Sequence, residues 1–393
     1  MGADPTVIGS HPAGGRSVGR VERWDVVVVG GGPAGSAAAL AARRSGASVL
    51  VLDRADFPRD KVCGDGVAPE ALDVLAGLGV DPAALVAGYP PVPRLALRSP
   101  GGARVERSTH RPSSVVPREV FDARLLDAAR AAGAVFRRAT VRTVAASADG
   151  VTVDGTVRAG VLVGADGAES VVRRALGLGS NRADRLAVAI RGYAPALPGQ
   201  DGTQLLVTTE QRWPAYAWSF PLGDGRANVG YGELVSGGAT RAALVEGLHR
   251  LLPGVAPEGL RAHRLPLSTG RPRLPDGRAL LAGDAASLVN PLTGEGIFYA
   301  VLSGALAGAA WSAGAGAGAR YREALRRRLG AHLRATRVAS ELSRWPRLMD
   351  AAVRAAGADQ RVFDDVVALG LAEGRLTGRT VAAAALGLVR GRG

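Results

Sequence analysis

Two reactive side chains stand two positions apart in the stretch DFPRDKVCGDGVAP, residues 56–69. Lys61 is the only lysine and Cys63 the only cysteine of the 393 residues, and the other 48 basic residues are arginine. A thiol is small, polarizable and a weak hydrogen-bond donor, and a compact ammonium fits where a planar guanidinium does not. The pair is therefore a candidate for chemistry, with chance survival of Lys61 and a buried structural role for Cys63 as the alternatives.

The stretch WDVVVVGGGPAGSAAALAARRSGASVLVLDR predicts the element that positions a cofactor. Four consecutive valines predict a strand buried on both faces, and Gly30, Gly32 and Gly35 have the G-x-G-x-x-G spacing of a dinucleotide-binding turn. Gly30 permits the tight turn, Gly32 lets the backbone approach a pyrophosphate at the helix N-terminus, and Gly35 allows close helix–strand packing. Asp53 ends the second strand, where its carboxylate can accept from an adenosine ribose hydroxyl.

Two later segments favour FAD over a nicotinamide cofactor, because a nicotinamide domain needs neither. VRAGVLVGADGAESVVRRALG reads as a strand that ends at Asp166-Gly167 and leads into a helix, and GRALLAGDAASLVNP reads as a strand that ends at Gly283-Asp284. Asp284 can bind the ribityl chain, while Gly294 and Gly296 let backbone amides approach the isoalloxazine. The helix that starts near Gly296 directs its positive end at the N1–C2=O edge, where reduced flavin carries negative charge.

Between these segments, VVPREVFDARLLDAARAAGA predicts a helix that opens with Arg118. Arg118 reaches the phosphate or ribityl region of the cofactor in one interpretation and is a surface arginine in the other. ATVRTVAAS is expected to be a strand, on which the backbone of Val141 meets the adenine.

On these residues the chain resembles the geranylgeranyl reductase family, within the FAD-dependent superfamily that also contains p-hydroxybenzoate hydroxylase and the flavin halogenases. The resemblance runs from about residue 24 to about residue 310. Three stretches carry it: PRDKVCGDG matches P-x-x-K-x-C-G-D-G, YAWSFPLGDGRANVGYG matches Y-x-W-x-F-P followed by G-x-G, and VNPLTGEGI replaces the Gly-Gln-Gly version of the hydroxylases. Cys-Gly-Asp-Gly also differs from the Gly-Glu-Ser of the halogenases.

The resemblance implies a set of site residues. It places Lys61 and Cys63 on a loop that faces the flavin, as candidate catalytic residues. Together with the glycine and aspartate signals above, the expected cofactor-binding residues are Gly30, Gly32, Ala34, Gly35, Asp53, Arg54, Cys63, Gly64, Gly66, Arg118, Val141, Asp166, Gly283, Asp284, Gly294, Gly296 and Ile297.

Three aromatic residues alternate in a chain that is only 4% aromatic. On a strand, Tyr216, Trp218 and Phe220 project from one face. They wall an elongated apolar pocket for a prenyl chain in the family's arrangement, together with Pro291, or they fill an ordinary sheet core.

The expected fold class is α/β, with a Rossmann-like FAD-binding domain interrupted by an antiparallel β-sheet substrate domain and followed by a C-terminal helical segment. TQLLVTTE, PAYAWSFPL and RANVGYGEL predict a meander, which PRLALRS and ARVERST join. The expected boundaries are a disordered lead-in over 1–23, FAD-binding parts over 24–88, 115–180 and 271–312, substrate-domain parts over 89–114 and 181–270, and C-terminal helices over 313–393, entered through a flexible joint at SAGAGAGARY.

The net charge of +14 is unevenly distributed, because 15 arginines and 7 acids lie from residue 320 onward. A solvated helical face, peripheral contact with anionic lipid and nucleic-acid binding are the alternatives, and the last is disfavoured because basic and aromatic residues do not interleave. A single cysteine is typical of a reducing compartment such as the cytoplasm. The expected location is therefore the cytoplasm, either free or in peripheral contact with the inner membrane face. Neither a signal peptide, a membrane-spanning run nor a metal site is indicated.

The resemblance implies reduction of carbon–carbon double bonds of a prenyl substrate, a geranylgeranyl-type lipid, diphosphate or quinone side chain, by hydride transfer from reduced flavin. A flavin-dependent monooxygenase or oxidase acting on a hydrophobic metabolite is the alternative, and a binding protein without turnover is a third possibility. Because there is no second glycine fingerprint, we expect NAD(P)H or another small electron donor to bind transiently. Tyr216, Cys63 and pocket water are the candidate proton donors.

Overall fold

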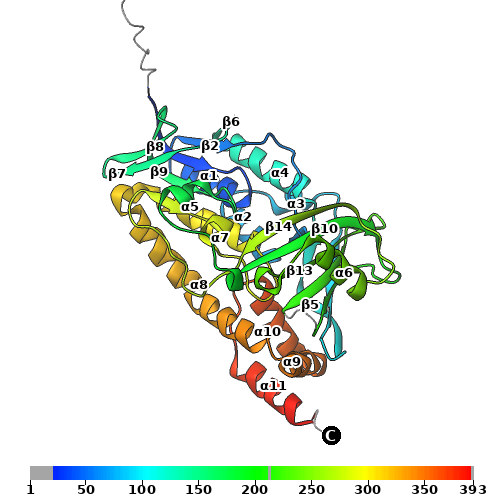
Figure 1. The fold of residues 1–393 in the computed structure, drawn as a ribbon. Helices are drawn as coiled ribbons and strands as arrows, with labels where there is room; N and C mark the ends of the chain where they lie inside the picture. Colours follow the sequence, from blue (N-terminus) through cyan, green and yellow to red (C-terminus); the bar gives the residue numbers. More distant parts are fainter. Residues whose placement is uncertain (1–20, 211–213, 391–393) are drawn as a thin grey trace, which may run out of the picture.

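The computed structural model describes residues 21–210 and 214–390, so residues 1–20 of the lead-in expected over 1–23 lie outside this range. Two sheets and a helical C-terminal segment make up the fold (Figure 1). The expected fold class is confirmed. β1 begins at Glu22, inside the expected lead-in, because the Glu22 amide donates to Thr156 O at 3.0 Å and its side chain pairs with Arg137 at 2.9 Å.

The first sheet has the order β6-β2-β1-β9-β8-β7, and β15 also pairs with β9. Its central strands are parallel, and their apolar parts, residues 26–29 of β1, 49–52 of β2 and 161–163 of β9, are buried on both faces. The strands are β1 (Glu22–Val29), β2 (Val49–Asp53), β6 (Val135–Arg138), β7 (Val144–Ser147), β8 (Gly150–Val153), β9 (Val157–Gly164) and β15 (Ala279–Leu281). The expected strand over residues 139–147 is wrong in its first half, because the Asp154 carboxylate accepts from the amides of Arg142 and Thr143 and replaces a ladder there.

Two helices cover this sheet and touch backbone to backbone. They are α1 (Pro33–Arg44), which connects β1 to β2, and α7 (Ile297–Ala309). A Cβ atom added at Gly304 would lie 2.0 Å from Ala34 O, and one at Gly308 would lie 2.2 Å from Ala38 O. Glycine is therefore required on α7 at both positions. The other helices of this half are α2 (Pro69–Gly77), α3 (Pro82–Val86), α4 (Arg118–Ala131) and α5 (Val171–Ala175).

The second sheet has the order β14-β10-β13-β12-β11-β4-β5-β3 and is antiparallel except for the β11–β4 pair. The predicted meander is present as β11, β12 and β13, and β4 and β5 extend it. The strands are β3 (Gly66–Val67), β4 (Pro91–Arg98), β5 (Arg104–Val115), β10 (Leu186–Pro195), β11 (Thr203–Thr208), β12 (Ala215–Pro221), β13 (Arg226–Leu234) and β14 (Glu258–Pro266), with α6 (Arg241–Leu251) packed on β13.

The C-terminal segment consists of α8 (Ala317–Leu342), α9 (Pro346–Ala358), α10 (Gln360–Leu371) and α11 (Gly378–Arg390). The expected flexible joint before it is instead a 3-10 helix, Trp311–Gly316, with a kink at Gly314, where φ is 55°. α8 runs from beside the first sheet down to the other C-terminal helices, and α9 to α11 lie below the second sheet in this view (Figure 1). Among the described residues no single helix is long and apolar enough to cross a bilayer, and one pair, α7 with the segment Trp311–Leu342, meets those criteria jointly while bent by 94°.

Candidate active site

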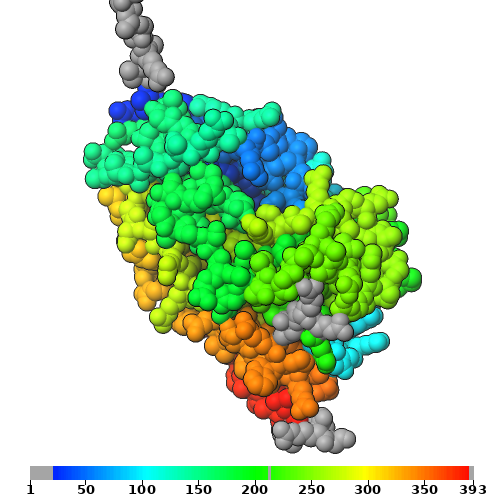
Figure 2. Space-filling view, in the orientation of Figure 1, coloured from blue at the N-terminus to red at the C-terminus, as the bar shows by residue number. Residues whose placement is uncertain are grey.

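One cavity of about 730 Å³ runs between the two sheets, from the start of α1 to the strand β12. Every expected site residue lines it except Gly35 and Gly283. Those two glycines act behind the wall: a Cβ atom at Gly35 would lie 1.8 Å from Gly30 O, and one at Gly283 would lie 3.2 Å from the Cβ of Ala34. In the space-filling view a dark-blue part of the chain, near the start of the described residues, is recessed behind its surroundings (Figure 2).

The start of α1 forms an anion-binding end of this cavity. Gly30 has φ of +105°, and Gly32 is the N-cap residue with no side-chain cap, so the first amides of α1 open toward the cavity. The Asp53 carboxylate accepts from the Gly31 amide at 2.7 Å and the Ala55 amide at 2.9 Å, which fixes the turn. Arg54 and Val141 line the cavity at this end.

Two arginines share one buried carboxylate beside this turn. Arg118 donates to Asp122 through Nε at 2.6 Å and NH2 at 2.7 Å, and Arg59 lies 3.4 Å from the same carboxylate. Burial alone lowers the pKa of Arg118, but the Asp122 ion pair outweighs it and raises that pKa. Because two cations face one anion, the cluster keeps a net positive charge next to the helix N-terminus, which fits a diphosphate.

The start of α7 forms the opposite end of the cavity. Gly294 has φ of +68°, and Gly296 is the N-cap residue of α7. Asp284, which follows β15 in the 3-10 helix Gly283–Ala286, lies on the same wall. These glycines, the open amides of α1 and the net positive charge fit FAD, whose chemistry when bound is to take up and deliver a hydride.

Asp65 anchors the Cys-Gly-Asp-Gly loop. It has φ of 61°, is fully buried, and accepts from Tyr193 Oη at 2.6 Å and from Asn228 Nδ2 at 2.7 Å. Burial raises the pKa of Asp65 to about 6, although both donors and Arg191 favour its ionised form. This loop is therefore held by side chains of the second sheet, which are distant from it in sequence.

Backbone carbonyls of the same loop accept hydrogen bonds from Asn228 and from Arg191, both on the second sheet. Asn228 Nδ2 donates to Cys63 O at 2.9 Å, and the 2% exposed Arg191 donates to Lys61 O at 2.9 Å and to Cys63 O at 3.3 Å. Arg191 also pairs with Asp60 at 2.5 Å. The side chains of Asn228 and Arg191 thus fix the position of the Cys63 backbone in the cavity wall.

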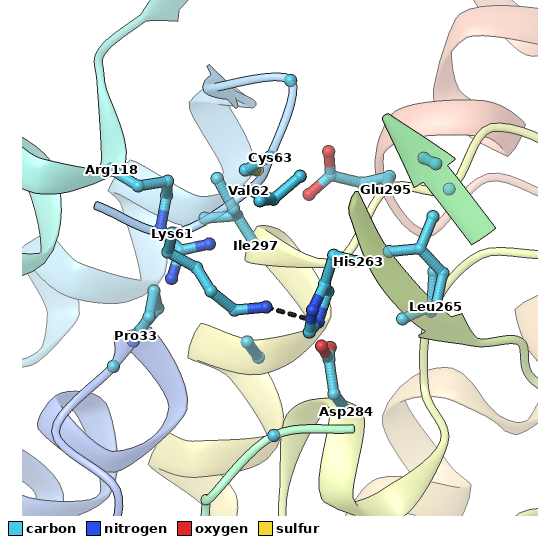
Figure 3. Close-up of a pocket in the computed structure, with 18 of the residues that line it drawn as sticks. Pro33, Lys61, Val62, Cys63, Arg118, His263, Leu265, Asp284, Glu295 and Ile297 are labelled. Atoms are coloured by element: carbon cyan, nitrogen blue, oxygen red, sulfur yellow. Dashed lines mark hydrogen bonds between the residues drawn. The ribbon is translucent and has the colours of Figure 1, made fainter. Parts of the chain in front are cut away.

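Cys63 and Lys61 both line the cavity, in different protonation environments (Figure 3). Burial raises the pKa of Cys63, so it is a thiol and not a thiolate near neutral pH. Burial lowers the pKa of Lys61 to about 8, with Asp284 opposing the shift, and the ammonium bonds to Nε2 of His263. Burial and Lys61 lower the pKa of His263 to about 3, so the ring is neutral and accepts from the ammonium.

The aromatic wall is formed by β12, because Tyr216, Trp218 and Phe220 all line the cavity. Trp218 Nε1 donates to Asn228 Oδ1 at 2.8 Å, and the Tyr216 and Trp218 rings lie 6.0 Å apart. A Cβ atom at Gly64 would lie 3.2 Å from the Phe220 ring, so the loop approaches this wall closely. Other apolar residues that line the cavity include Val62, Leu95, Leu206, Leu265, Leu292, Pro291 and Leu371.

The C-terminal helices complete one wall. Asn290 Nδ2 donates to Leu369 O at 3.0 Å and Gly370 O at 3.1 Å, and Thr293 Oγ1 donates to Gly370 O at 2.5 Å. The end of α10 is thereby fixed to the loop before α7, and Leu371 reaches the cavity.

Several residues of this site were missed in the sequence. Asp122 could have been found, since it stands four residues after Arg118 on a predicted helix. Asn228 and Glu295 stand inside the family motifs but were not singled out. Arg59, Arg191 and His263 carry no local signal, because their partners are brought together only by the fold.

Comparison with known proteins gives matches of both sequence and fold. Residues 23–200 match the model of an FAD binding domain. The menaquinone reductase of Mycolicibacterium smegmatis is 38% identical over 316 residues, 72% of this chain and 75% of that protein. Digeranylgeranylglycerophospholipid reductase 1 of Methanopyrus kandleri is 35% identical over 304 residues, 72% of this chain and 79% of that protein.

A geranylgeranyl bacteriochlorophyll reductase-like protein of Thermoplasma acidophilum has the same fold, with a TM-score of 0.78 at 22% identity over 94% of this chain and 98% of that one. A flavin-dependent brominase variant reaches a TM-score of 0.71 at 19% identity over 94% and 100% of the two chains. Identity this low shows the fold alone.

Proposed function

The chain belongs to the family of FAD-binding reductases that includes the menaquinone and digeranylgeranylglycerophospholipid reductases, and from this premise we propose that it reduces carbon–carbon double bonds of an isoprenoid chain. It is an FAD-dependent oxidoreductase. The observation that carries the proposal is that the aromatic wall of β12, the Cys63 loop and the start of α7 line one cavity. An apolar chain in that cavity would lie beside the flavin end.

The residues around this end act by placement and by excluding water. An isolated alkene is a poor hydride acceptor, so the rate depends on where the double bond is held. Trp218 and Phe220 hold the chain against Gly64, and Asn228 fixes Trp218 relative to Cys63. Cys63 packs against the substrate as a neutral thiol. Lys61 places one positive charge near Asp284, and its hydrogen bond to the neutral His263 ring holds the ammonium there.

The proposal includes an electron donor that binds transiently, NAD(P)H or another small carrier. Its support is the sequence, in which one strand–glycine–helix fingerprint stands alone. Stopped-flow reduction of the holoprotein by NADH, by NADPH and by reduced ferredoxin identifies the class of donor. If NAD(P)H leaves the flavin oxidised while ferredoxin reduces it, the nicotinamide part of this proposal is wrong.

The proposal also places the protein in the cytoplasm with peripheral contact to an anionic membrane. Val338 and Leu342 stand four residues apart at the end of α8, and Trp345 follows as the N-cap residue of α9; the three are 50%, 46% and 67% exposed. Arg334, Arg337, Arg344 and Arg347 are exposed around them. Exposed apolar residues surrounded by arginines are typical of a segment that lies on anionic lipid.

Vesicle flotation tests this contact. We expect binding to phosphatidylglycerol vesicles, weaker binding to phosphatidylcholine, and loss of binding in Trp345→Ser. Val135→Ser, which changes a 43% exposed residue on β6 of the first sheet, away from α8 and α9, is the matched control. Equal binding of Trp345→Ser and the control would refute the contact.

An anaerobic single-turnover experiment tests the activity. Chemically reduced holoprotein is mixed with menaquinone or a geranylgeranylated lipid, and the products are examined by mass spectrometry. We expect a gain of two hydrogens in the isoprenoid chain and reoxidation of the flavin. Oxygen incorporation in air without any such gain would refute the reductase and favour the monooxygenase.

A further inference from the structure

Glu295 presents a carboxyl group to the cavity at the start of α7. Its Oε1 accepts from the Phe298 amide at 2.8 Å, its own amide donates to Thr293 Oγ1 at 3.3 Å, and its carbonyl accepts from the Asn290 amide at 2.8 Å. The carboxyl group lies on the Cys63 side of the cavity (Figure 3). It is thus a fixed acid at the end where the glycines of α7 admit the flavin.

The surroundings of Glu295 set its protonation near neutral pH. Burial raises its pKa to about 7, although the amides of Phe298 and Ile297 and the charge of Arg118 lower it. The titratable and charged groups around it are Glu70 on α2, Arg118 on α4, Cys63 on the loop, Tyr216 on β12 and Tyr299 on α7, with Lys61, His263 and Asp284 further along the cavity.

Of the other acids around this part of the cavity, Asp65 also has a pKa near neutral, about 6, but it does not line the cavity. Burial raises the pKa of both Cys63 and Tyr216, so both keep their protons at neutral pH. Asp65 is fully buried and already bound by Tyr193 and Asn228. Glu295 is therefore the carboxyl group of this wall that both reaches the cavity and changes charge near neutral pH.

Reduction of an alkene consumes one hydride and one proton. We propose that Glu295 is the proton store of this site: it takes up one proton as the bound flavin is reduced by two electrons, and gives it to the alkene. One carbon then gains the hydride that FAD supplies, the neighbouring carbon gains the Glu295 proton, the π bond is lost, and Glu295 is left as a carboxylate. The donation step rests on the proposed function, whereas the uptake step does not.

Capping of α7 is the purely structural role for this carboxylate, and Glu295→Gln separates the two. A glutamine Oε1 can still accept from the Phe298 amide, but the side chain cannot titrate. Glu295→Ala removes the cap as well and serves as the control for a loss of structure.

The first measurement is the pH dependence of the flavin midpoint potential of the holoprotein, without substrate, between about pH 5 and pH 9. Around pH 7 wild type should take up one proton more per two electrons than Glu295→Gln, so its potential should fall more steeply with pH. Identical slopes in the two proteins would refute the proposal.

The second measurement is reoxidation of the reduced flavin by menaquinone with an isoprenoid side chain. Uptake on reduction requires that the reduced flavin raises the pKa of Glu295 above its value of about 7 without flavin. The wild-type rate should therefore stay high through pH 7 and fall at higher pH, where the Glu295 carboxyl loses its proton. Glu295→Gln should be slower by about 100-fold or more at pH 6, the scale of a lost general acid. An unchanged rate in Glu295→Gln would refute the donation step. If wild type itself does not reduce the chain, the proposed function fails, and the potentials still decide the role of Glu295.

Discussion

Replacement of Asn228 by alanine is the sharpest test of how the active-site loop is held. This side chain makes three hydrogen bonds from one buried amide: to Cys63 O at 2.9 Å, to Asp65 Oδ2 at 2.7 Å, and from Trp218 Nε1 at 2.8 Å. Two neutral bonds contribute about 1 kcal/mol each and the bond to the ionised carboxylate about 2 kcal/mol. Asn228→Ala should therefore lower the free energy of unfolding by roughly 4 kcal/mol, a large share of the stability of an ordinary domain.

Urea unfolding of the holoprotein at pH 7.5 measures this loss. The matched control is Ser219→Ala on the neighbouring strand, which removes a single buried neutral bond to Gln200 at 2.8 Å and should cost about 1 kcal/mol. We also expect Asn228→Ala to shift the flavin absorbance and to slow reduction of the isoprenoid chain, because Cys63 and Trp218 lose their common partner. If Asn228→Ala is no more destabilising than Ser219→Ala and leaves the flavin spectrum unchanged, the second sheet does not hold the Cys-Gly-Asp-Gly loop.

Three further outcomes are expected. Trp218→Ala should weaken turnover of prenyl substrates while FAD stays bound, as measured by kinetics and absorbance, and loss of FAD would mean that the aromatic wall is structural. Gly304→Ala should lower the thermal midpoint, because overpacking typically costs about 1–3 kcal/mol and the new Cβ would lie 2.0 Å from Ala34 O; Gly330→Ala on α8, with its nearest neighbour 3.5 Å away, is the control and should be neutral or stabilising. Lys61→Met should be more stable than wild type at pH 7, because burial lowers the pKa of Lys61 to about 8 and the folded state therefore disfavours the ammonium. This destabilisation of wild type disappears as pH rises from about 8 toward the pKa of lysine in the unfolded chain, so the stability difference should shrink over that window. A difference in melting temperature that stays constant with pH would contradict the assigned protonation.

The parts of the fold that the sequence predicts best are those whose cause is local. The strand of four valines, the glycine turn and the helix after it follow one another directly in the sequence as one β-α-β unit, so their spacing alone specifies β1, α1 and β2. The alternation of Tyr216 and Trp218 likewise predicts which side of β12 they share. These residues could be assigned to the cavity before its shape was known.

The rest depends on contacts between distant segments. Asn228 and Cys63 are 165 residues apart, so no window of sequence links them. Asp154 replaces the first half of an expected strand by binding amides eleven and twelve residues earlier, a competition that β-propensity does not express. The glycine-rich segment before α8 suggested flexibility, but buried Tyr321 and Leu325 pack α8 onto the core, and Gly314 makes the turn.

The direct backbone contact of α1 with α7 has a consequence for ligand length. Since Gly304 and Gly308 leave no side chain between the two helices, neither helix start can drift along the other, and the two positive poles keep one separation. A mononucleotide flavin would satisfy one pole and leave the other to water, whereas a dinucleotide spans both. The close contact of the two helices thus fixes the distance between the two ends of the cavity, which favours a ligand long enough to reach both.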